Sequence, residues 1–177
     1  LWMIANSMGG EVVVDTFHRL HEDPDFADAD TEIENVMLTA PDVSHEEFNR
    51  RFRREMMNLA ANVTVYVSSN DRALLASRLI NRGSRLGEST LDTSNPGMVI
   101  QTTRIAELLE PADERLVLVD VTPVNRTRNF HNFSLETPEF FDDLFLRFTN
   151  GQLPMSRALY FLETPEGVRY FVLTRGR

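Results

Sequence analysis

The chain has 177 residues, of which 42% are hydrophobic and 25% are charged, so it holds enough apolar material for the core of one globular domain. Its formal net charge of −9 argues against a nucleic-acid-binding or anionic-membrane-binding surface, because either would need a basic patch. The chain contains no cysteine, which excludes disulfides, a thiol nucleophile and a cysteine metal site but leaves the compartment open. No apolar run in the sequence approaches the length of a membrane span.

The first motif is a serine turn between an apolar run and an amphipathic stretch. Residues 1–4 can form a buried strand, and the turn Ala5-Asn6-Ser7-Met8-Gly9-Gly10 is followed by apolar residues at helical spacing, namely Val13, Val14, Phe17 and Leu20. Strand, tight turn and helix in this order are typical of a nucleophile elbow, where small residues flank the serine at two positions' distance. Here those residues are Ala5 and Gly9, and a flexible Ser-Met-Gly-Gly loop is the alternative interpretation.

Strands and helices alternate along the rest of the chain. Strands are predicted over residues 33–40, 62–68 and 116–121, and helices over 44–59, 72–80, 100–109 and 137–150, with a polar loop over 83–97. Ser44 and Glu47 form a capping box, and Thr137-Pro138 caps the last helix. Residues 158–162 and 168–173 are predicted to form a β-hairpin. The pattern predicts an α/β fold: a parallel sheet with helices on both faces, followed by a C-terminal β-hairpin.

Working residues of parallel sheets lie on loops after the carboxyl ends of strands. Four candidates follow predicted strand ends: Ser7, Asp42, Asp71 and His131. The order Ser7, Asp71, His131 matches the Ser…Asp…His order of α/β hydrolases. Asp71 can also cap the helix after it, and Asp42 is the runner-up acid, for which a turn role at Pro41-Asp42 competes.

The remaining polar and aromatic clusters have simpler interpretations. His18, His21 and His45 are predicted to be solvated helix residues, and Arg50, Arg51, Arg53 and Arg54 to form an exposed helix face. The acidic residues between Asp23 and Glu32 lack the spacing and glycine of a calcium loop, so we expect a solvated loop there. The phenylalanines between residues 140 and 148 are expected in the core.

Several segments resemble the α/β-hydrolase superfamily, specifically a poorly characterised bacterial, serine-hydrolase-like family within it. They are I-A-N-S-M-G-G, M-L-T-A-P-D-V, V-T-V-Y-V-S-S-N-D-R-A-L, R-L-G and F-H-N-F, and they cover about residues 1 to 150. The resemblance implies that Ser7 is the nucleophile, Asp71 the acid and His131 the base. Two positions depart from it: Asn6 stands where relatives usually carry histidine, and Phe130 stands where a small residue usually precedes the histidine.

The resemblance implies an acyl-enzyme mechanism on a small-molecule carboxylic ester or related acyl bond, with no cofactor and no metal. The backbone N–H of Met8 would form half of an oxyanion hole. The loop that usually gives the second donor is not found, so residues 1–150 are expected to be the C-terminal part of a hydrolase domain, weakly active or inactive alone, and 151–177 a hairpin extension. A non-catalytic α/β-hydrolase-like binding or scaffold domain is the alternative function.

Overall fold

A six-stranded sheet lies at the centre of the computed structural model, which describes residues 1–26, 33–68, 71, 115–128, 131–150, 159–163 and 169–174. The strands are β1 (Trp2–Asn6), β2 (Ile33–Thr39), β3 (Ala60–Val67), β4 (Leu116–Asp120), β5 (Leu159–Glu163) and β6 (Arg169–Leu173), in the spatial order β1-β2-β3-β4-β6-β5. All neighbouring strands are parallel except β5, which is antiparallel to β6. The predicted α/β class with a C-terminal antiparallel pair is therefore confirmed.

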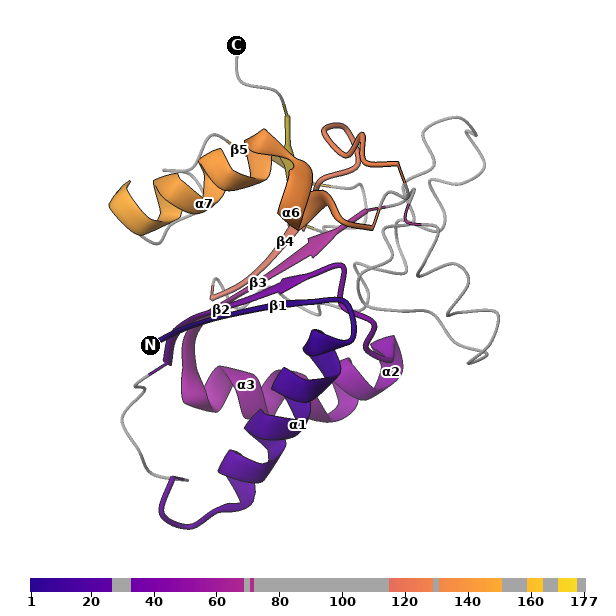
Figure 1. Cartoon of the computed structure of the whole chain (residues 1–177). Coiled ribbons are helices and arrows are strands. Elements are labelled where there is room, and N and C mark those ends of the chain that lie inside the picture. The colour runs from indigo at the N-terminus through magenta and orange to yellow at the C-terminus, as the bar shows by residue number, and fades with distance from the viewer. Residues whose placement is uncertain are drawn as a thin grey trace.

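Helices cover both faces of this sheet, as predicted (Figure 1). On one face lie α1 (Gly9–Glu22), α2 (His45–Glu47), the π-helical turn η1 (Phe48–Phe52) and α3 (Arg53–Leu59). On the other lie α6 (Phe133–Glu136) and α7 (Pro138–Asn150). The helices predicted over 72–80 and 100–109, and the loop over 83–97, lie outside the described residues. None of the helices in the described ranges combines the length and apolarity that crossing a bilayer requires.

The central strands are buried on both faces, which explains their near-continuous apolar sequence. In β2, Val36 and Leu38 belong to the cluster that contains Phe17 of α1. Met37, between them, belongs to the opposite cluster, which contains Phe140 of α7. Because successive side chains of a strand point to opposite faces, one strand contributes to both halves of the core.

The C-terminal hairpin is part of the same sheet rather than a separate unit. β6 pairs in parallel with β4, with Val119 opposite Phe171 and Asp120 opposite Val172. The antiparallel partner β5 then forms the outer edge. The turn residues predicted the hairpin, whereas the parallel pairing depends on α6 and α7 crossing back over the sheet.

The helical segment after β2 is continuous but contains a wider turn. α2, η1 and α3 follow one another without a break, and Phe48 and Met56 are fully buried, as their spacing predicts. The backbone N–H of Glu47 lies 3.5 Å from the Ser44 hydroxyl, so half of the predicted capping box is present as a long contact.

The expectation that the phenylalanines of α7 form core is wrong for three of them. Phe141, Phe145 and Phe148 are 47%, 65% and 52% exposed, and Phe148 stacks on Trp2 of β1 with ring centroids 3.9 Å apart. The buried face is formed instead by Phe140 together with two charged residues, Asp143 and Arg147.

These two charged residues attach α7 to the sheet through buried hydrogen bonds. Arg147 donates to the Asn35 side-chain oxygen at 2.7 and 3.1 Å and to the Thr64 hydroxyl at 2.6 Å. One helical turn earlier, Asp143 accepts a 2.6 Å hydrogen bond from the Tyr66 hydroxyl. The polar side chains of β2 and β3 thus specify how α7 packs, because a buried guanidinium needs partners.

We expect Arg147→Ala to lower the free energy of unfolding by about 3 kcal/mol, since it removes buried charged hydrogen bonds and opens a cavity. Urea unfolding followed by circular dichroism would measure the change. The matched control is Arg19→Ala, which removes an arginine 78% exposed and paired with Asp15, and should cost less than about 1 kcal/mol. Equal effects of the two substitutions would contradict this account of how α7 is held.

Candidate active site

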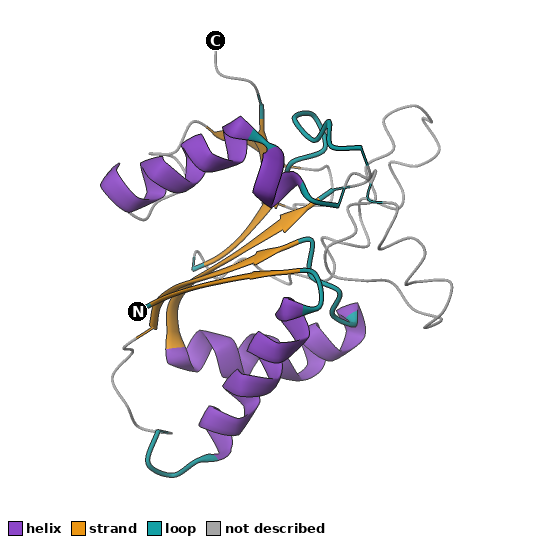
Figure 2. Ribbon diagram, viewed as in Figure 1, coloured by secondary structure: helices purple, strands orange, loops and turns teal. Residues whose placement is uncertain are grey.

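The carboxyl ends of β1 to β4 meet at one edge of the sheet, because these strands are parallel. The described loops after β1, β2 and β4, coloured teal, leave the sheet at this edge (Figure 2). All four residues predicted at strand ends follow these strands: Ser7 after β1, Asp42 after β2, Asp71 after β3 and His131 after β4.

Ser7 lies in the turn between β1 and α1 with φ of 55°, in the left-handed region that non-glycine residues rarely adopt. Its N–H donates to the Thr39 carbonyl at 3.0 Å. Its own carbonyl accepts the N–H of Gly10 at 2.9 Å and of Asp42 at 3.2 Å. A serine on a strained strand-to-helix turn is the local geometry that the elbow motif predicts.

The glycines of the turn differ in how much room they have. A Cβ at Gly9 would lie 3.6 Å from the Ala5 Cβ, which is ordinary contact. A Cβ at Gly10 would lie 2.9 Å from the Pro41 Cβ and 3.2 Å from a Val43 methyl carbon. The start of α1 therefore packs so closely on the β2–α2 loop that the position needing glycine is Gly10, one residue beyond the motif.

Asp71 and His131 form a hydrogen-bonded pair. The His131 Nδ1 lies 2.7 Å from an Asp71 carboxylate oxygen, although sixty residues separate them. Asp71 is completely buried, and its N–H contacts the Ser68 carbonyl at 3.4 Å. A carboxylate on Nδ1 orients the imidazole ring, and in a catalytic triad the other ring nitrogen, Nε2, is the one that accepts the proton.

The hydrogen bond to Asp71 raises the pKa of His131 above its ordinary value of 6.5. Burial opposes this, while the charges of Asp71 and Asp42 raise the pKa further. Asp42, the runner-up acid, thus acts on the ring through its charge and on Ser7 through its backbone N–H. Both carboxylates favour an imidazolium at this place.

Met8 occupies the N-cap position of α1, and its side chain is 69% exposed. The first N–H groups of a helix have no partner within the helix and lie at the positive end of its dipole. Among the described residues, no hydrogen bond joins the Ser7 hydroxyl to the His131 ring.

The side chain of Asn6 accepts hydrogen bonds from two hydroxyl groups that no local sequence pattern predicts. Its side-chain oxygen accepts hydrogen bonds from Thr39 at 2.8 Å and from Ser134 at 3.0 Å. Ser134 belongs to α6, a single helical turn that the sequence analysis did not predict. Asn6 therefore contributes to the structure of the site.

Asp120, at the end of β4, is a buried carboxylate that no sequence motif indicates. Burial raises its pKa, while hydrogen bonds from Thr122 oppose the shift. His18 was expected to be solvated, but its side chain is only 16% exposed and contacts Glu55 at 2.9 Å and Glu22 at 3.2 Å. That expectation is wrong because α3 brings Glu55 against α1. The side chain of His45 lies outside the described residues.

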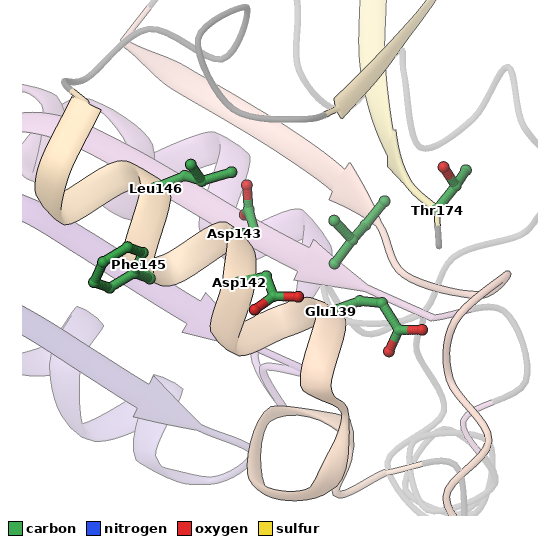
Figure 3. A pocket seen from close by; sticks show the side chains of 7 residues that line it. Glu139, Asp142, Asp143, Phe145, Leu146 and Thr174 are labelled. Carbon is green, nitrogen blue, oxygen red and sulfur yellow. The ribbon is translucent and has the colours of Figure 1, made fainter. Parts of the chain in front are cut away.

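A cavity of about 320 Å³ lies between α7 and the end of β6 (Figure 3). Its lining residues are Glu139, Asp142, Asp143, Phe145, Leu146, Leu173 and Thr174. None of the four candidate residues lines it. Within the described ranges, no cluster of three or more histidine, aspartate or glutamate side chains is arranged to hold a metal ion.

A parallel sheet with a serine elbow after one strand and an Asp–His pair after later strands has the organisation of an α/β hydrolase. Residues 1–140 match the model of a family described as an alpha/beta hydrolase of unknown function (DUF900), and the chain belongs to this family. No curated protein and no solved structure is detectably similar to the chain.

The packing of the turn predicts a difference between its two glycines. Gly10→Ala should lower the free energy of unfolding by about 1–3 kcal/mol, because the added methyl group overlaps Pro41. Gly9→Ala is the matched control and should be neutral or stabilise by up to about 1 kcal/mol, since alanine is the better helix residue. Thermal and urea unfolding of both variants would measure this, and a Gly10→Ala variant as stable as wild type would contradict the packing.

A second prediction concerns the protonation of His131. Asp71→Asn should lower the His131 pKa, because it removes the carboxylate that stabilises the imidazolium. In the wild type the folded pKa exceeds the ordinary one, so protonated His131 stabilises the fold below about pH 6.5, and this contribution is lost as the pH rises through the folded pKa. NMR titration of the His131 ring would measure the pKa. Glu34→Gln, which removes a carboxylate beside Trp2, is the control and should leave it unchanged.

Proposed function

We propose that this chain carries the serine-hydrolase chemistry of its family, acting on a carboxylic ester or related acyl bond of a small molecule. The observation that carries the proposal is the 2.7 Å contact between the buried Asp71 and His131, at the edge where Ser7 is held on a left-handed turn. In this proposal Ser7 is the nucleophile, His131 the general base and acid, and Asp71 the residue that orients the ring.

The reaction follows from these roles. The His131 Nε2 takes the Ser7 hydroxyl proton while the serine oxygen attacks the substrate carbonyl carbon. The protonated ring then gives this proton to the leaving alcohol as the carbon–oxygen bond breaks, which produces an acyl-enzyme. Water, deprotonated by the same ring, hydrolyses the acyl-enzyme and regenerates Ser7.

Charge in the transition state develops on the carbonyl oxygen and on His131. The backbone N–H of Met8, at the start of the 14-residue helix α1, is the proposed oxyanion donor. Asp71 and Asp42 stabilise the imidazolium, as the raised pKa of His131 indicates. The site is proposed to need no cofactor.

A fluorophosphonate probe tests this proposal, because it reacts with an activated serine without needing the natural substrate. Wild-type protein should be labelled at Ser7, identified by peptide mass spectrometry. Ser7→Ala should abolish labelling, and His131→Gln should slow it by at least about 10³-fold.

His18→Gln is the matched control, because His18 also contacts a carboxylate through Nδ1 but lies on α1 against α3. It should be labelled at the wild-type rate. Absence of Ser7-dependent labelling in the wild type would overturn the proposal and favour a non-catalytic binding or scaffold domain.

A further inference from the structure

The segment that carries His131 is hydrogen-bonded to the rest of the site on both sides of the histidine. Before it, Asn125 contacts the residue that ends the β3 region, Ser68. After it, Ser134 contacts the residue that precedes the nucleophile, Asn6. We refer to these as the upstream contact and the downstream contact.

The upstream contact is completely buried. Asn125 is 3% exposed, and its side-chain nitrogen donates to the Ser68 hydroxyl at 2.8 Å. Its side-chain oxygen accepts the Thr127 hydroxyl at 2.9 Å, and its backbone N–H donates to the Val121 carbonyl at 2.9 Å. These contacts fix Asn125 both to its own loop and to the end of the β3 region. Loss of either partner would lower the stability of the fold, because a buried amide without a hydrogen bond costs free energy.

Ser68 links this contact to the acid of the proposed triad. Its side chain accepts from Asn125, while its carbonyl lies 3.4 Å from the Asp71 N–H. A shift of the His131 loop relative to β3 would therefore break the Asn125 contact and misalign the Asp71–His131 pair together.

The downstream contact connects the His131 segment to the residue before Ser7. Asn6 is held from one side by the fully buried Thr39 of β2, and from the other by Ser134, which is 7% exposed. Ser7 follows Asn6 directly, and Ser134 lies three residues after His131. This contact thus sets how the histidine loop lies relative to the serine turn.

We propose that Asn125 and Asn6 are positioning residues, one for the Asp71–His131 pair and the other for the approach of His131 to Ser7. The effect on Ser7 rests on the proposed function, whereas the geometry at His131 can be measured independently. Neither asparagine touches the reacting atoms in this proposal, and each acts through a serine hydroxyl.

Replacing the serine of each contact by alanine separates the upstream role from the downstream role. Ser68→Ala should move the His131 pKa toward 6.5 and weaken the low-field NMR signal of its Nδ1 proton, because the Asp71 contact loosens while Asp71 and Asp42 keep their charges. Ser134→Ala should leave both signals unchanged but slow the fluorophosphonate labelling of Ser7 by about 10- to 100-fold. Ser134→Thr, which keeps the hydroxyl, should restore the labelling rate.

Thr149→Ala is the control, because it removes an exposed hydroxyl at the end of α7 that contacts only its own helix turn in the described structure. It should change neither readout. Asn125→Ala should shift the His131 pKa as Ser68→Ala does, and combining the two should add little, as expected for residues that share one contact. This second variant keeps the test decisive if one of the two folds poorly, which circular dichroism would show.

The upstream role is overturned if folded Ser68→Ala and Asn125→Ala both keep the wild-type His131 pKa and Nδ1 proton signal. The downstream role is overturned if Ser134→Ala is labelled at the wild-type rate, or if Ser134→Thr is as slow as Ser134→Ala. If the wild type shows no Ser7-dependent labelling, the proposed function and the downstream role fail together, while the NMR readout still decides the upstream role.

Discussion

The left-handed backbone of Ser7 is the constraint on which the arrangement of the carboxyl edge depends. This conformation costs a non-glycine residue about 1–2 kcal/mol, and three backbone hydrogen bonds, to Thr39, Gly10 and Asp42, oppose that cost. The partners belong to β2, to α1 and to the loop after β2, so three segments must stay packed for the turn to persist. Ala40, which follows β2, is also left-handed, with φ of 43°. The orientation of one hydroxyl is thereby tied to the stability of the core beneath it.

Charge at this edge is arranged to favour a positive histidine. His131 is bonded to a carboxylate with no exposure and is influenced by a second, in a chain whose net charge is −9. This arrangement stabilises the imidazolium that would form during acyl transfer, but it also requires a higher pH before the ring is neutral and able to accept a proton. A site of this kind exchanges base availability at low pH for stabilisation of the charged ring, and the hydrogen bond to Asp71 contributes most to the raised pKa of His131.

Local patterns predicted the positions of the strands and of α1, but the expectation of a buried strand over residues 1–4 is wrong, since Leu1 and Ile4 are 72% and 50% exposed. They also predicted that residues at strand ends come together, because parallel strands bring their carboxyl ends to one edge regardless of sequence distance. They did not predict which face of α7 is buried. Apolar periodicity predicts that Phe145 is buried and Arg147 exposed. Arg147 is buried instead, because it donates hydrogen bonds to Asn35 of β2 and Thr64 of β3. The burial of Arg147 depends on partners that are distant in the sequence, so no local pattern predicts it. The contact of Asn125 with Ser68 was missed for the same reason.

The distance along the chain between the parts of this site has a consequence for how the protein is made. Ser7 is synthesised long before Asp71 and His131, and the contact between Asn6 and Ser134 spans 128 residues. The serine turn needs only β1, β2, α1 and the loop after β2, whereas the Asp71–His131 pair requires the chain through His131 and the Asn6–Ser134 contact requires α6. Between the synthesis of Asp42 and that of Ser134, a ribosome-bound chain would therefore contain every residue of the serine turn without the assembled candidate site. The proposed activity would then arise only after these long-range contacts form, and contacts between residues distant in the sequence are slow to form.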